Sequence, residues 1–178
     1  MSDDMNTFTW TSLGRLTGSV RFMPTGPNGS TLNVTQDVAQ MSAVIAAFLA
    51  AVSFPPGGRP AYDAIRDLFV DGGLLVKNSG DVPEISTVDE FIEPRRKQVD
   101  SGELASFEEL EIAHLTEVFG NVGHRLSSYA KRGELGGVAI DVRGVILTQF
   151  IRTPDGWRIT SMAWDDERPG LVIPERYL

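Results

Sequence analysis

Residues 107 to 131 read FEELEIAHLTEVF-GN-VGHRLSSYAK, and this stretch decides the fold class. Apolar and polar side chains alternate on both sides of Gly120-Asn121, a pair that is typical of two-residue hairpin turns. The stretch therefore predicts two long antiparallel strands, at residues 107–119 and 122–131, joined by a tight turn.

A second pair of alternating segments, residues 138–152 and 157–165, predicts another antiparallel hairpin. The two segments flank the sequence TPDG at residues 153–156, whose residue types are those of a turn. Four long consecutive strands of this kind predict an extended antiparallel sheet in the second half of the chain.

The hydrophobic period before residue 103 is helical rather than strand-like. It predicts helices at residues 36–52, 61–69 and 87–99, with a short strand at residues 74–76. The third helix begins with the sequence TVDE at residues 87–90, which is the pattern of a capping box. Three helices followed by four long strands predict an α+β fold, with the helices packed on one side of a curved, mainly antiparallel sheet.

Residues 1–35 differ in composition from the rest of the chain. They hold seven threonines, four glycines and two prolines, in short alternations that suggest extended structure. We therefore expect an N-terminal extension over residues 1–35 and one α+β domain over residues 36–178. The most apolar run, residues 42–54, has thirteen residues, whereas a helix needs about 20 to cross a bilayer. It predicts a buried helix, no membrane contact and a cytoplasmic location.

The composition disfavours several classes of function. The 178 residues include 24 acidic and 16 basic side chains, and the resulting net charge of −8 disfavours binding to nucleic-acid phosphates. Cysteine is absent, which excludes disulfides, thiol nucleophiles and cysteine metal ligands. The two histidines, His114 and His124, are too few for a multi-histidine metal site. We expect neither a metal nor another cofactor.

Strand alternation sorts the side chains of the first hairpin into two faces. A two-residue turn places Thr116 opposite Arg125 and Ile112 opposite Tyr129, with His114 on the same face. We expect this face to turn inward, because a few polar groups among apolar ones suit a ligand cavity. A one-residue bulge would invert the assignment. The opposite face, which carries Glu111 and the pair Glu117–His124, is also partly apolar, and this predicts a homodimer formed through the sheet.

In the second hairpin the same reasoning puts Gln149, Met162 and Trp164 on one face. We expect that face to line the pocket, because tryptophan offers a flat apolar wall and a hydrogen-bond donor. The candidate ligand-binding residues from both hairpins are His114, Thr116, Arg125, Tyr129, Gln149 and Trp164.

The candidates also have purely structural interpretations. His114 would serve as a general base or as a core histidine hydrogen-bonded to Ser127 or a helix carbonyl. Burial and the nearby Arg125 should lower its pKa. Arg125 would clamp a ligand carboxylate or pair with an acid of a helix, such as Asp67 or Glu93. Tyr129 would donate to a ligand carbonyl or anchor the end of a strand. The sequence alone leaves both interpretations open for each residue.

Several short motifs between residues 40 and 170 carry a resemblance to a known family. They are FVDGG at 69–73, FI at 91–92, GNV at 120–122, SSY at 127–129, GWRI at 156–159 and AWD at 163–165. With the order of elements, they resemble the nuclear transport factor 2-like superfamily, which includes ketosteroid isomerase, scytalone dehydratase and the SnoaL-like polyketide cyclases. The ending WDDERPG at residues 164–170 is similar to that of SnoaL-like bacterial proteins without an assigned activity.

The resemblance implies a cone-shaped barrel, three N-terminal helices on the concave face of the sheet, and dimers formed through the sheet. It does not carry over the catalytic residues of ketosteroid isomerase. The chain reads Val76-Lys77-Asn78 where that enzyme has its acidic base, and residues 47–49 lack the tyrosine that would donate to the oxyanion. A paired histidine and aspartate, as a dehydratase or cyclase would need, is also absent at clearly matching positions. Steroid isomerisation is therefore not expected.

Three functions remain open. The first is an apolar pocket with a few polar anchors that binds a small apolar or carbonyl-bearing molecule. The second is a cofactor-independent cyclase, isomerase or dehydratase, with His114 as base and Arg125 or Tyr129 stabilising an enolate oxygen. The third is a dimeric interaction module whose cavity is filled by its own side chains. The missing carboxylate at Asn78 favours the first and third functions over the second, and the first is our principal expectation.

Overall fold

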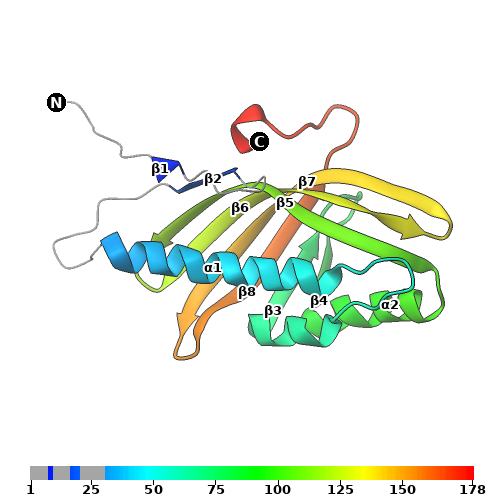
Figure 1. Cartoon of the computed structure of the whole chain (residues 1–178), viewed down its shortest axis with the longest axis horizontal. Helices are drawn as coiled ribbons and strands as arrows, with labels where there is room; N and C mark the ends of the chain where they lie inside the picture. The colour runs from blue at the N-terminus through cyan, green and yellow to red at the C-terminus, as the bar shows by residue number, and fades with distance from the viewer. Residues whose placement is uncertain (1–7, 10–16, 21–30) are drawn as a thin grey trace.

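The computed structural model describes residues 8–9, 17–20 and 31–178, and the side chains of the last range from residue 34 onward. Four long strands form an antiparallel meander, as the sequence predicts (Figure 1). They are β5 (Leu104–Phe119), β6 (Val122–Leu135), β7 (Val138–Thr153) and β8 (Gly156–Asp166). Each spans the predicted segment and extends one to four residues beyond it at one end or both.

The sheet continues on both sides of the meander, in the order β1-β2-β5-β6-β7-β8-β3-β4. On one side β3 (Phe69–Lys77) runs parallel to β8 and antiparallel to β4 (Glu84–Thr87). On the other side β2 (Thr17–Val20) runs parallel to β5 and antiparallel to β1 (Phe8–Thr9). The fold is therefore α+β with a mixed sheet in which antiparallel pairs dominate. The cone shape stays a prediction.

The first helix, α1 (Thr31–Val52), begins five residues before its predicted start and ends just before Pro55-Pro56. The predicted boundary at residue 35 therefore falls inside α1, and part of the predicted extension, β2, pairs with β5. Most of residues 1–30 lie outside the described residues. The division of the chain into an extension and a domain stays a prediction.

One side of α1 forms the centre of the core. Met41, Ile45 and Phe48 are buried against sheet residues such as Phe150 and Ile159. We call the sheet face that meets α1 the inner face. By length and composition the stretch Val34–Val52 could also cross a membrane, which the thirteen-residue count did not anticipate. This is weak evidence, because the core helix of a soluble protein passes the same test.

The second predicted helix is a short 3-10 helix, η1 (Tyr62–Leu68), followed at once by β3. The third, α2 (Val88–Asp100), begins at the predicted capping box. The backbone N–H of Thr87 donates to the Glu90 carboxylate at 2.8 Å, and the N–H of Glu90 donates to the Thr87 hydroxyl at 3.3 Å. This reciprocal bonding satisfies two donors that a helix start leaves free, so the local sequence fixes where α2 begins.

The meander has three register shifts, of which the two between Glu111 and Ala113 and between Gln149 and Phe150 decide the faces of the predicted site residues. The predicted pairs Thr116–Arg125 and Glu117–His124 are present, with 3.2 Å between His124 Nε2 and the Glu117 carboxylate. The register then shifts between Glu111 and Ala113, so that Glu111 rather than Ile112 lies opposite Tyr129. The expectation that Glu111 faces outward is therefore wrong, because the bulge reverses the alternation before Ala113.

The second shift lies between β7 and β8. The turn alone would pair Gln149 with Thr160, but in β7 the residues before Phe150 pair with the next residue along β8. Met162 therefore lies opposite Thr148, and Trp164 lies opposite Ile146. Gln149 is exposed, whereas Thr148 and Met162 are buried. The prediction that Gln149 shares the pocket face is wrong, because the bulge separates it from Met162 and Trp164.

The outer face of the sheet is partly covered by the end of the chain itself. The C-terminal 3-10 helix η2 (Glu175–Tyr177) contacts β5, and the buried Ile173 donates its backbone N–H to the Glu167 carboxylate at 2.8 Å. Large apolar side chains such as Val122 and Leu147 remain exposed. The expected homodimer through the sheet stays a prediction.

Candidate functional site

A cavity of about 180 Å³ lies between the sheet, the end of α1, η1 and α2. Most of its wall is apolar and includes Phe48, Phe91, Phe107, Ile146, Met162 and Trp164. Five residues bring polar groups to it, namely Tyr62, Lys77, Arg95, Glu109 and Lys131. An apolar cavity with a few polar groups is the usual form of a small-molecule site.

Glu109 is the only carboxylic acid of this lining. Its backbone N–H donates to Ser53 Oγ at 3.0 Å, and Ser53 Oγ donates to the Leu49 carbonyl at 2.7 Å, which fixes β5 to the end of α1. Its carboxyl group makes no hydrogen bond with another residue of the described chain. Burial raises the pKa of Glu109 to about 7, against the opposing effects of Lys131 and Arg95. The cavity thus holds a carboxyl group that exchanges its proton near neutral pH.

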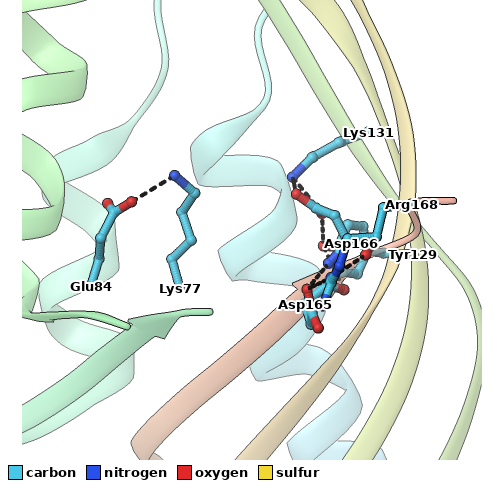
Figure 2. A network of polar contacts seen from close by, with 7 residues as sticks. All are labelled: Lys77, Glu84, Tyr129, Lys131, Asp165, Asp166 and Arg168. Carbon is cyan, nitrogen blue, oxygen red and sulfur yellow. Dashed lines mark hydrogen bonds and ion pairs between the residues drawn. The ribbon is translucent and has the colours of Figure 1, made fainter. Parts of the chain in front are cut away.

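Lys131 belongs to a polar network behind one wall of the cavity (Figure 2). Its ammonium group donates to both oxygens of the Asp166 carboxylate, at 2.7 and 2.8 Å. The Tyr129 hydroxyl donates to the same carboxylate. Burial and this hydrogen bond raise the pKa of Tyr129, so the phenol stays protonated. The charge of Lys131 is therefore balanced inside the protein before any ligand enters.

Lys77 comes to the cavity from β3 and has its own partner. Its ammonium group donates to the Glu84 carboxylate of β4 at 2.9 Å, and this contact lowers the pKa of Glu84. Figure 2 shows this ion pair apart from the pair of Lys131 and Asp166. Lys77 therefore brings a cation to the cavity whose charge is already balanced by Glu84.

Arg95 reaches the cavity from α2. Its guanidinium centre lies 3.6 Å from the centroid of the Phe91 ring, and Nη1 donates to the Phe91 carbonyl at 2.9 Å. No carboxylate forms an ion pair with it in the part of the chain that the structure describes. Burial lowers the pKa of Arg95, because the charged form loses its hydration.

Arg125 is buried on the inner face, as predicted, but it lies outside the cavity. Its guanidinium donates to both oxygens of Glu111, at 2.8 and 2.5 Å, and to the hydroxyls of Ser42 and Thr116, at 2.9 and 3.2 Å. Its partner is therefore Glu111, and the expectation of a helix acid such as Asp67 is wrong. The bulge explains the difference, because it brings Glu111 to the inner face.

His114 lies beside this ion pair and does not line the cavity. Its Nδ1 is 3.5 Å from the Thr116 hydroxyl. Burial, together with the nearby Arg125, lowers the pKa of His114 to about 4, while Glu111 opposes the shift. The ring is therefore neutral at pH 7, in the direction that the sequence predicts. The anticipated bond to Ser127 is absent, because that hydroxyl donates to Glu111 at 2.6 Å.

Of the six predicted ligand-binding residues, Trp164 lines the cavity, where its ring meets Phe91 edge to face at 6.2 Å. Tyr129 stands one layer behind Lys131, and the other four lie elsewhere. Sequence reasoning missed all five polar residues of the lining as ligand contacts, namely Tyr62, Lys77, Arg95, Glu109 and Lys131. Strand alternation continued from Tyr129 places Lys131 on the same face of β6, so the sequence could have revealed it. The inward position of Glu109 depends on the bulge between Glu111 and Ala113.

Comparison with known proteins gives the fold. Neither a family model nor a curated protein matches the chain. A putative dehydratase from the NTF2-like family of Streptomyces avermitilis aligns over 76% of this chain and 99% of its own, with a TM-score of 0.59 and 18% identity. The chain has a nuclear transport factor 2-like fold.

Two further structures support this assignment. A hexachlorocyclohexane dehydrochlorinase, LinA-type3 from Novosphingobium barchaimii, is 12% identical and has a TM-score of 0.65 over 82% of this chain and 99% of its own. An NTF2-like protein with a cystatin-like fold from Novosphingobium aromaticivorans is 17% identical, with a TM-score of 0.57 over 79% of this chain and 91% of its own. At these identities the similarity establishes the fold alone.

Proposed function

We propose that this nuclear transport factor 2-like chain binds a small molecule in the cavity that Glu109 lines. The carboxyl group of Glu109 carries the proposal, because it faces an apolar cavity without a hydrogen-bond partner in the described chain. The Glu109 side chain is half-buried, and a polar group that loses water without gaining a hydrogen bond is unfavourable, so a partner that enters the cavity would stabilise it. A ligand with a hydroxyl or carbonyl group would do so.

The size of the cavity limits the ligand. An engineered cavity of about 150 Å³ holds benzene, so a cavity of about 180 Å³ fits one substituted ring. Phe48, Phe91 and Trp164 would contact its apolar body. The size and lining of the cavity support small-molecule binding. The open volume of about 180 Å³ disfavours an interaction module whose cavity is filled by its own side chains.

A pair of neighbouring variants tests the binding site. Ile146 lines the cavity, whereas Leu147, the next residue of β7, is exposed on the outer face. Ile146→Phe should fill the cavity and weaken the binding of benzyl alcohol at least about tenfold, or about 1.4 kcal/mol, while Leu147→Phe should bind like the wild type. Saturation-transfer NMR measures the affinity, and thermal melts confirm that both variants are folded. Equal binding by the two variants would contradict the proposed site.

A second candidate function is acid–base catalysis with Glu109 as the base. A pKa of about 7 favours it, because a general base works best when its pKa lies near the operating pH. His114 fits this role less well, since its pKa of about 4 makes it a weak base and it stands outside the cavity. In such a reaction the Glu109 carboxylate would take a proton from a carbon next to a carbonyl group. A neighbouring cation would stabilise the enolate oxygen.

Isotope exchange tests this chemistry without knowledge of the substrate. In D₂O the protein should accelerate loss of the methyl protons of acetophenone, because the ionised Glu109 removes a proton that solvent deuterium then replaces. The rate should rise with pH around a pKa of about 7. Glu109→Gln should abolish the acceleration, whereas Glu108→Gln, at the exposed neighbouring position, should retain it. An unchanged rate in Glu109→Gln would exclude Glu109 as the base.

A further inference from the structure

The basic groups around the cavity differ in whether they have an acidic partner. Lys77 is paired with Glu84, and Lys131 with Asp166. Arg96, the neighbour of Arg95 on α2, donates to Asp63 at 2.8 Å on the protein surface. Arg95 differs from them, because its contacts within the described chain are the carbonyl and the ring of Phe91.

One edge of the Arg95 guanidinium remains available for a ligand. Nη1 donates to the Phe91 carbonyl, whereas Nε and Nη2 make no hydrogen bond with any described residue. These two donors form the planar fork that binds both oxygens of a carboxylate. The Phe91 ring under the guanidinium holds its plane in a fixed orientation.

The charges that line the cavity leave an excess of positive charge. The two lysines are balanced by Glu84 and Asp166, so Arg95 and Glu109 determine the remainder. Glu109 in its protonated form contributes no charge, so the half-buried Arg95, which has no ion-pair partner among the described residues, keeps its positive charge with only the more distant Glu84 acting on it. A buried unpaired charge is costly, and an anion that enters beside it relieves that cost.

We infer that the ligand of this cavity is a small carboxylate with an apolar body, held by the free edge of Arg95 while the protonated Glu109 donates a hydrogen bond to it. The inference rests on the proposed binding function and adds the chemical class of the ligand. Its apolar body lies against Phe48 and Trp164, and its carboxylate lies at the α2 side of the cavity.

Binding of such an anion depends on pH through Glu109. The charged and titratable groups that face Glu109 are Arg95 of α2, Lys131 of β6 and, behind it, Asp166 of β8, with Tyr62 and Lys77 elsewhere on the wall. An ionised Glu109 repels the ligand carboxylate, whereas a protonated one donates to it. Affinity should therefore fall as pH rises through the pKa of Glu109, which burial has raised to about 7.

Benzoate and benzyl alcohol are suitable probes, because both carry one ring and benzoate alone is charged. In the wild-type protein, benzoate should bind at least about tenfold more tightly than benzyl alcohol, a difference of about 1.4 kcal/mol. Arg95→Met should remove this advantage and leave the binding of benzyl alcohol unchanged. Arg96→Met, whose native side chain pairs with Asp63 outside the cavity, is the matched control and should keep the advantage.

The outcomes separate this inference from the function on which it rests. If the wild type binds benzyl alcohol at least as tightly as benzoate, the carboxylate inference is overturned and the binding function stands. Retention of the benzoate advantage in Arg95→Met would equally overturn the role of Arg95. If neither probe binds at millimolar concentration, both proposals fail.

A pH series tests the part played by Glu109. Between about pH 6 and about pH 8, around a pKa of about 7, wild-type affinity for benzoate should fall. Glu109→Gln donates a hydrogen bond at every pH, so its affinity should stay constant over the same range. A wild-type affinity that does not change with pH would overturn the hydrogen bond from protonated Glu109.

Discussion

Replacing Glu111 with leucine should lower the free energy of unfolding by about 3–5 kcal/mol, because the change leaves a buried arginine without its carboxylate. Arg125 is 2% exposed and holds Glu111 by two hydrogen bonds, and the Glu111 side chain is 9% exposed. Ser127 also donates to Glu111 at 2.6 Å and would lose its partner. Urea unfolding at pH 7 measures the loss.

The double variant Glu111→Leu/Arg125→Met separates the charge from the packing. Replacing a whole buried ion pair by apolar residues costs far less than breaking it, so the double variant should be more stable than the sum of the two single changes predicts, by about 2 kcal/mol or more. The exposed pair of Arg132 and Asp141 on β6 and β7 is the control. The same substitutions there should change stability by less than about 1 kcal/mol. Additive effects at Glu111 and Arg125 would contradict the assigned pair.

The sequence predicted those features of the fold that depend on local patterns. Gly120-Asn121 forms the predicted two-residue turn, Thr87 and Glu90 form the predicted capping box, and Pro55-Pro56 follows the end of α1 closely. Each of these signals acts within a few residues of itself, because turn and cap geometry is set by neighbouring backbone and side chains.

The candidate site was harder to predict, because it depends on two bulges. Alternation from the turn holds as far as Ala113, and one extra residue then exchanges the faces, so that Glu109 and Glu111 turn inward. The second bulge lies at Thr160 of β8 and turns Met162 and Trp164 to the inner face, while Gln149 of β7 stays on the outer face. A bulge inserts one unpaired residue into a strand, and no residue type in these strands indicates where it occurs. Strand alternation alone therefore could not reveal that Glu109 faces the cavity.

Stability should depend on pH through Glu109 in the direction opposite to that of an ordinary surface acid. Its pKa is raised from 4.5 to about 7 in the folded protein, so the folded state binds the proton more tightly than the unfolded state. The stabilisation is fully present below pH 4.5 and is lost as pH rises through about 7. Because a difference of one in pKa corresponds to about 1.4 kcal/mol, the contribution of Glu109 to the free energy of unfolding should fall by about 3 kcal/mol over this pH range.

The wild-type curve alone would conceal this effect, because other groups oppose it. Glu84 and Glu90 have lowered pKa values, so they contribute stability that is lost as pH falls. His114 acts in the same sense, since its pKa in the folded state is lowered to about 4 and its protonation favours the unfolded chain. The difference between the wild type and Glu109→Gln isolates Glu109, because these other groups remain in both proteins.

We expect that difference to grow by about 3 kcal/mol in favour of Glu109→Gln between about pH 4.5 and about pH 8, measured by urea unfolding at each pH. Glu108→Gln, at the exposed neighbouring position on β5, should give a curve parallel to the wild type. Parallel curves for Glu109→Gln as well would mean that Glu109 titrates normally. Its carboxyl group would then be ionised at pH 7 and would repel the carboxylate ligand that we infer. The pH series therefore tests, without any ligand, the protonation state that the proposed site requires.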